Sequence, residues 1–123
     1  MAKGKKLAEW SMKATSVTYL PGPAGSTLAQ VNFEGTATGG FGTISGTATF
    51  VGGKSGTMSY CGAAYLENGD QLSANGPGTY EATGKHHWHT QGVLHVSDGS
   101  ALLSEGELDL ATRTWSGTVA EWS

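Results

Sequence analysis

The stretch FGTISGTATFVGGKSGTMSYCGAAYLENGD, residues 41–70, decides the fold class. It holds two β-prone runs, residues 41–51 and 55–66, which Gly52-Gly53 separates, and the second run ends at Asn68-Gly69-Asp70. Gly-Gly and Asn-Gly pairs adopt the positive φ angles of tight hairpin turns. Within each run, apolar side chains alternate with Thr and Ser, which is typical of strands with one buried face. The stretch therefore predicts antiparallel hairpins.

The same pattern of short alternating runs between turn residues extends over the rest of the chain. The further expected strands are residues 7–20, 28–38, 71–82, 85–96, 100–110 and 114–122. Eight short strands with short connections predict an all-β, up-and-down barrel, whose interior is just wide enough for side chains or one small ligand. An open sandwich of the same strands is the alternative. Pro77 predicts an irregularity or an edge position, because proline cannot donate to a strand ladder.

Composition predicts one domain over residues 1–123, with a flexible basic tail at residues 1–6. The chain has 14% charged residues and a net charge of −3, without a basic stripe, which argues against a nucleic-acid partner. So little charge leaves Ser, Thr and Ala, or another copy of the chain, to cover the outward faces, and we expect a homo-oligomer. A run long enough to cross a membrane and an apolar signal segment are both missing, which predicts a cytoplasmic protein with no membrane partner.

Alternation sorts the strand residues into two faces. One phase is apolar and contains Val31, Phe33, Ile44, Ala48, Phe50, Met58, Tyr60, Trp88, Leu94 and Val96. The simple interpretation places this phase inside, and the inverse arrangement remains open because a bulge shifts the parity. Phe33, Phe50, Met58, Cys61 and Trp88 are the expected ligand-binding residues. Cys61 is the only cysteine, so an intramolecular disulfide is excluded.

The histidine-rich stretch KHHWHTQGVLH, residues 85–95, is the densest group of chemically active side chains. On a strand, His87 and His89 point to one side about 7 Å apart and could chelate a metal, with His95 as a third ligand. A cupin-like site would need an acidic ligand a few residues on, and none is present. We therefore expect no metal and no cofactor, and keep the metal site as an alternative. A purely structural role for these histidines is the other one.

Histidine and tyrosine are the expected acid–base residues. His86 shares the phase of Trp88, and a desolvated imidazole beside an indole would be neutral and available as a base. If the opposite phase lies inside, His87 and His89 take that role. Tyr60 and Tyr65 carry phenols that could hydrogen-bond a substrate carbonyl, although packing in the core is the alternative for both.

Residues 65–81, YLENGDQLSANGPGTYE, resemble the middle of the plant allene oxide cyclases through Leu72-Ser73, Gly76-Pro77 and Thr79-Tyr80-Glu81. Together with the dirigent proteins, that family forms oligomeric eight-stranded antiparallel barrels, which guide cyclisation or coupling of apolar intermediates without a cofactor. The resemblance implies a barrel of the allene oxide cyclase kind; a calycin-like barrel is a second form that fits the strand pattern.

These observations lead to three functional hypotheses. The first is an isomerase, cyclase or lyase that acts on an apolar small molecule inside the barrel, without a cofactor. The second is a carrier of a small hydrophobic ligand that leaves the ligand unchanged. The third is a metal-binding barrel built on His87 and His89.

Overall fold

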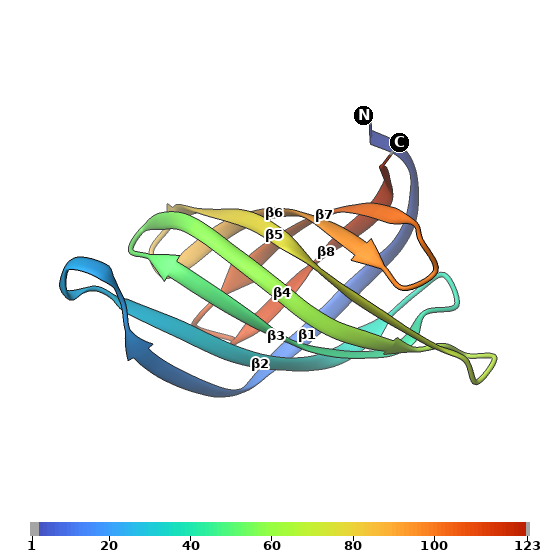
Figure 1. Ribbon diagram of the computed structural model, residues 1–123, viewed down its shortest axis with the longest axis horizontal. Coiled ribbons are helices and arrows are strands. Elements are labelled where there is room, and N and C mark those ends of the chain that lie inside the picture. The colour runs from blue at the N-terminus through green and yellow to red at the C-terminus, as the bar shows by residue number, and fades with distance from the viewer. Residues whose placement is uncertain (1–2, 123) are drawn as a thin grey trace.

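The computed structural model describes residues 3–122, which form a closed antiparallel barrel with the strand order β1 to β8 (Figure 1). Each strand pairs with its neighbours in sequence, and β8 closes the sheet on β1. The predicted all-β, eight-stranded up-and-down barrel is confirmed, and the open sandwich is excluded. The strands are β1 (Lys3–Pro21), β2 (Thr27–Ala37), β3 (Gly42–Gly52), β4 (Ser55–Tyr65), β5 (Gln71–Gly84), β6 (His87–Val96), β7 (Ala101–Asp109) and β8 (Thr114–Trp122).

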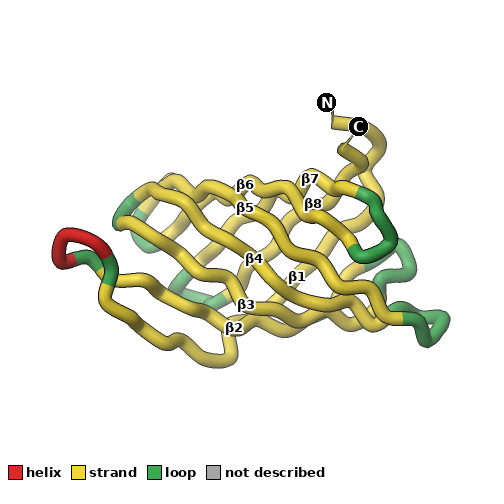
Figure 2. The backbone as a smooth tube through the Cα atoms, viewed as in Figure 1, coloured by secondary structure: helices red, strands yellow, loops and turns green. Residues whose placement is uncertain are grey.

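A single turn of 3-10 helix, η1 (Pro23–Gly25), connects β1 to β2 and is drawn red in Figure 2. Within residues 3–122, no helix is long and apolar enough to cross a membrane. The connections between the other strands are short turns, as the Gly-rich sequence predicts.

The first strand begins earlier than the sequence suggests. Residues 3–6, expected to be part of a flexible tail, pair with β8 in the register Lys3↔Trp122 and Lys6↔Ala120. The Lys5 amide also donates to a carboxylate oxygen of Glu121 at 3.1 Å. Backbone pairing with β8 and this contact hold the segment in the sheet, so the tail is corrected to a strand from Lys3 onward. Residues 1 and 2 lie outside the described part of the chain.

Pro77 lies in β5, which has a neighbour on both sides in the closed barrel, so it is not at an edge. The ladder between β5 and β6 passes from Asn75↔His95 to Gly78↔Gly92 without a pair at Pro77. The predicted irregularity is confirmed, because the proline nitrogen has no hydrogen to donate to β6.

The apolar phase faces the interior, so the inverse arrangement is excluded. Phe33, Ala48, Phe50 and Met58 are all buried. At the centre lies Trp115, only 3% exposed. Aromatic rings surround its indole, with centroid distances of 5.1 Å to Trp10, 4.9 Å to Phe33, 6.4 Å to Phe50 and 5.9 Å to Tyr60.

The central tryptophan also carries the one buried side-chain hydrogen bond recorded within the described residues. Its Nε1 donates to Oγ1 of Thr90 at 3.0 Å, and Thr90 is only 2% exposed. A buried donor that loses its acceptor is costly, so this bond fixes the orientation of the indole. The aromatic layer around Trp115 therefore divides the barrel interior into two ends.

Candidate functional site

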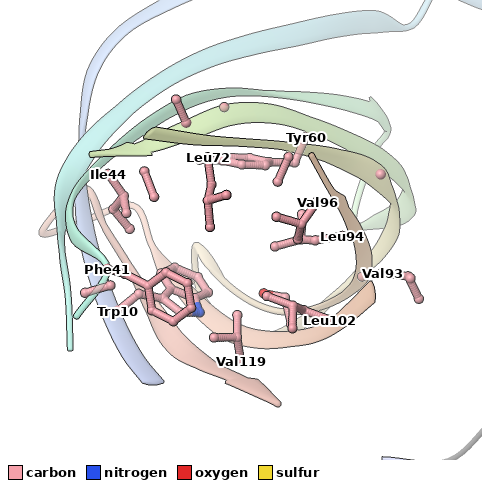
Figure 3. A pocket seen from close by; sticks show the side chains of 18 of the residues that line it. Trp10, Phe41, Ile44, Tyr60, Leu72, Val93, Leu94, Val96, Leu102 and Val119 are labelled. Atoms are coloured by element: carbon pink, nitrogen blue, oxygen red, sulfur yellow. The ribbon is translucent and has the colours of Figure 1, made fainter. Parts of the chain in front are cut away.

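One end of the barrel contains an apolar cavity of about 120 Å³, which we call the inner cavity (Figure 3). Aliphatic side chains from β3, β5, β6, β7 and β8 form much of its wall: Ile44, Leu72, Leu94, Val96, Leu102 and Val119. Trp10, Phe41, Tyr60 and Trp115 add aromatic surface, and Met58 contributes from β4. None of the lining residues carries a formal charge. The inner cavity is therefore suited to an uncharged, apolar occupant.

Tyr60 provides a phenolic hydroxyl in this wall. Its ring lies against Gly46 and Gly62, which face each other across β3 and β4, and a Cβ atom on either glycine would overlap the ring. Aromatic side chains often cover glycines in this way in curved sheets. Burial, with a smaller contribution from Cys61, raises the pKa of Tyr60 to about 12. Tyr60 is therefore a protonated hydrogen-bond donor at neutral pH, and its hydroxyl has no hydrogen-bond partner among residues 3–122.

The three histidines expected to act in catalysis lie away from the inner cavity. His86 is exposed in the turn between β5 and β6, where its φ angle of 54° takes it out of the strand and of the Trp88 phase. His87 and His89 are on the outer face of β6, since Trp88 and Thr90 face inward. Nδ1 of His87 lies 2.8 Å from Oγ1 of Thr83. Nδ1 of His89 lies 3.5 Å from Oε1 of Glu107.

Tyr65 and Cys61 also lie outside the barrel. Both have the opposite parity to Tyr60 on β4, and this strand has no bulge that would change the phase. Tyr65 is 51% exposed, and Cys61 is exposed beside Thr47 and Asn75 in a shallow outer hollow. The structure therefore places Cys61 away from the interior ligand site, and Tyr60 is the only one of the five expected catalytic residues in the cavity wall.

The expected ligand-binding residues divide between the two ends of the barrel. Met58 lines the inner cavity, whereas Phe33, Phe50 and Trp88 line a separate hollow at the opposite end. Leu72, Leu102 and Val119 were not among the expected ligand-binding residues, although the same alternation in their strands places them on the inner face. The alternation in the sequence therefore places these residues inside the barrel, but it does not indicate at which end of the barrel a residue lies.

The alternative metal site would lie on the outer face of β6. His87 and His89 have separate partners there, and His95 is exposed further along the strand, opposite Asn75 and Ala101. Over the described residues 3–122, no group of three or more His, Cys, Asp or Glu side chains could hold a metal ion.

Comparison with protein-family models, with curated proteins and with solved structures finds no match to this chain. Residues 65–81, on which the expected relationship to the allene oxide cyclases rests, form the last residue of β4, the turn that follows it and most of β5. This stretch contributes Leu72 to the cavity wall. A Cβ atom at Gly76 would overlap the backbone oxygen of Val93, so the close approach of β5 to β6 requires glycine there.

Proposed function

We propose that this protein binds a small, uncharged apolar molecule in the inner cavity. The observation that carries the proposal is a cavity of about 120 Å³ whose wall consists of aliphatic and aromatic side chains with one phenol. An engineered apolar cavity of about 150 Å³ in another protein stays dry and binds benzene. The volume therefore favours a ligand of about one six-membered ring.

Tyr60 gives the ligand a preferred orientation. A protonated phenol without a protein partner can donate to one acceptor, such as a ketone or ether oxygen. Its raised pKa keeps the proton in place at neutral pH, where it donates and does not act as a base. The preferred ligand is therefore an apolar ring with a single oxygen acceptor.

Binding without chemical change is better supported than catalysis. The isomerase or cyclase hypothesis joined a histidine with a tyrosine, but His86, His87 and His89 lie outside the cavity that contains Tyr60. Tyr60 alone remains as a proton donor for that chemistry. The relationship to the allene oxide cyclases stays a prediction.

The test uses a pair of matched ligands, cyclohexanone and methylcyclohexane, with binding measured by NMR titration. We expect both to bind. Replacing Tyr60 by Phe should lower the affinity for cyclohexanone roughly three- to tenfold, which corresponds to the loss of one hydrogen bond, and leave the affinity for methylcyclohexane unchanged. Equal loss for both ligands, or for neither, would contradict the orienting role of the phenol.

A cavity-filling variant locates the ligand. Ala74 lines the inner cavity, whereas Ala101 lies on the outer face of β7, opposite His95. Ala74→Leu should abolish binding of both ligands, and Ala101→Leu, the same change outside, should preserve it. Binding that survives Ala74→Leu would refute the site. Gas chromatography should show that cyclohexanone recovered from the protein is chemically unchanged. If the protein instead converted a candidate substrate, and Tyr60→Phe abolished that conversion, the result would support the cyclase hypothesis.

The expected homo-oligomer and cytoplasmic location also stay predictions. Sedimentation equilibrium of the purified chain tests the first, and fractionation of cells that express it tests the second.

A further inference from the structure

The opposite end of the barrel contains a second hollow, which we call the basic-end hollow. It has a volume of about 490 Å³, within the range of about 300–1,000 Å³ found for ligand pockets. Its lining includes Tyr19, Phe50, Tyr80, Trp88, Leu108 and Arg113. Phe33 also lines this hollow, and its ring lies 4.9 Å from that of Trp115, which lines the inner cavity. The aromatic layer thus separates the two spaces.

The hollow opens on one side because β1 is longer than its neighbour β8. The last pair between these strands is Lys13↔Thr114, whereas β1 continues to pair with β2 as far as Pro21↔Thr27. The β1–β2 hairpin therefore extends past the end of β8, and Figure 1 and Figure 2 show it projecting beyond the other turns at that end. Beside the opening, the apolar side chains of Tyr19 and Leu110 are 68% and 52% exposed.

The turns give this end of the barrel a positive charge. The connections β3–β4, β5–β6 and β7–β8 lie here, and their charged residues are Lys54, Lys85 and Arg113. At the other end, the charged residues of the β4–β5 and β6–β7 connections are all acidic, namely Glu67, Asp70 and Asp98. The turns at the two ends of the barrel therefore carry opposite charges, although β1 also places Lys3, Lys5 and Lys6 at the end with the acidic turns, and Asp109 ends β7 at the other.

Arg113 is the cationic group that borders the hollow itself. It forms no ion pair with any residue in the described range 3–122. The nearby carboxylate in sequence, Asp109, accepts a hydrogen bond from the Ala111 amide at 2.9 Å. A guanidinium group presents paired donors that match a carboxylate in a bidentate arrangement.

We propose that the basic-end hollow binds an organic anion with an apolar body, such as a medium-chain fatty acid. The carboxylate lies at Arg113, and the hydrocarbon body covers the exposed apolar surface of Tyr19 and Leu110 and contacts Trp88 and Leu108. This site and its charged ligand are separate from the uncharged ligand of the inner cavity.

The experiment measures binding of decanoate and of 1-decanol to the intact protein by isothermal titration calorimetry, below the solubility limit of each. The test variant is Arg113→Asn. Arg113 has a φ of 57°, and asparagine tolerates this left-handed conformation better than most residues, so the variant should fold at least as well. The control, Lys5→Gln, removes the same charge from β1 near Glu121, at the other end of the barrel.

We expect decanoate to bind about tenfold more weakly to Arg113→Asn, and equally well to Lys5→Gln. Decanol should bind the parent protein more weakly than decanoate does, and its affinity should not change in Arg113→Asn. Tyr19→Ser should lower the affinity for both ligands, because it removes aromatic surface beside the opening. The proposal fails if Arg113→Asn retains parent affinity for decanoate, or if Lys5→Gln loses as much, because the charge effect would then be nonspecific. The cavity-filling Ala74→Leu variant should bind decanoate normally, so failure at one site is distinguishable from failure at the other.

Discussion

The hydrogen bond from Trp115 to Thr90 offers the sharpest test of how the barrel centre is held together. Thr90→Val removes the acceptor and retains a β-branched side chain of strong strand propensity. The change should therefore not disturb β6 itself. The variant leaves Nε1 of Trp115 buried and without a hydrogen-bond acceptor. Among the described residues, Nε1 of Trp10 and Nε1 of Trp88 are already buried without a hydrogen-bond partner.

The expected loss follows from the burial of both partners. Leaving a buried donor unsatisfied costs about 1–3 kcal/mol, and domains of this size have unfolding free energies of about 5–15 kcal/mol. With about 4 °C per kcal/mol, the melting temperature should fall by about 4–12 °C. Trp115→Phe removes the donor instead and leaves the Thr90 hydroxyl without a partner.

Urea unfolding of the parent, the two single variants and the double variant forms a mutant cycle. Each single change leaves one orphaned polar group, and the double change leaves neither. The double variant should therefore lose less stability than the sum of the singles, by about 1 kcal/mol or more. Additivity within about 0.4 kcal/mol, or a Thr90→Val variant as stable as the parent, would refute the reasoning.

The remaining predictions concern backbone packing, pH and accessibility. A Cβ atom at Gly35 would overlap the backbone oxygen of Ser11, whereas one at Gly53 meets nothing within 4 Å; Gly35→Ala should unfold at a urea concentration far below that of Gly53→Ala, and similar midpoints would contradict this packing. The pKa of Tyr60 is raised to about 12 by burial, so its contribution to stability is complete below the unfolded pKa of about 10 and is lost as pH rises towards 12. Tyr60→Phe should flatten the fall in unfolding free energy between these pH values, and an unchanged slope would show that Tyr60 does not cause it. Cys61 is exposed on the outer face, so a thiol reagent should label it in the folded protein without lowering the affinity for cyclohexanone. Loss of cyclohexanone binding on labelling would show that Cys61 contacts the cavity.

The strand order and the inward phase could be predicted because both depend on local sequence. Gly52, Gly69 and Gly99 mark hairpin turns and have the positive φ angles of 112°, 95° and 92° that favour glycine. Within a regular strand, successive side chains point to opposite faces, so Phe33 and Met58 were assigned to the interior, and both are buried there.

The composition of the site depended on features that local patterns do not carry. His86 has a positive φ although it is not a glycine, and this removes it from the strand phase that the sequence suggested. The register also shifts between Ala14 and Ser16, so parity counted along β1 changes there. Above all, Phe33 and Met58 share the inner face but line different spaces, because the aromatic layer around Trp115 lies between the two ends.

The pairing of Lys3 with Trp122 brings the two ends of the described chain together at the same side of the barrel (Figure 1). A short flexible linker between them would turn the chain into a ring without bending any strand. New ends could then be opened at the β4–β5 turn, where Gly69 has nothing within 4 Å of an added Cβ. In such a circular permutant, β1 and β8 would become consecutive strands, and their pairing would no longer have to wait for the two most distant segments of the chain to meet.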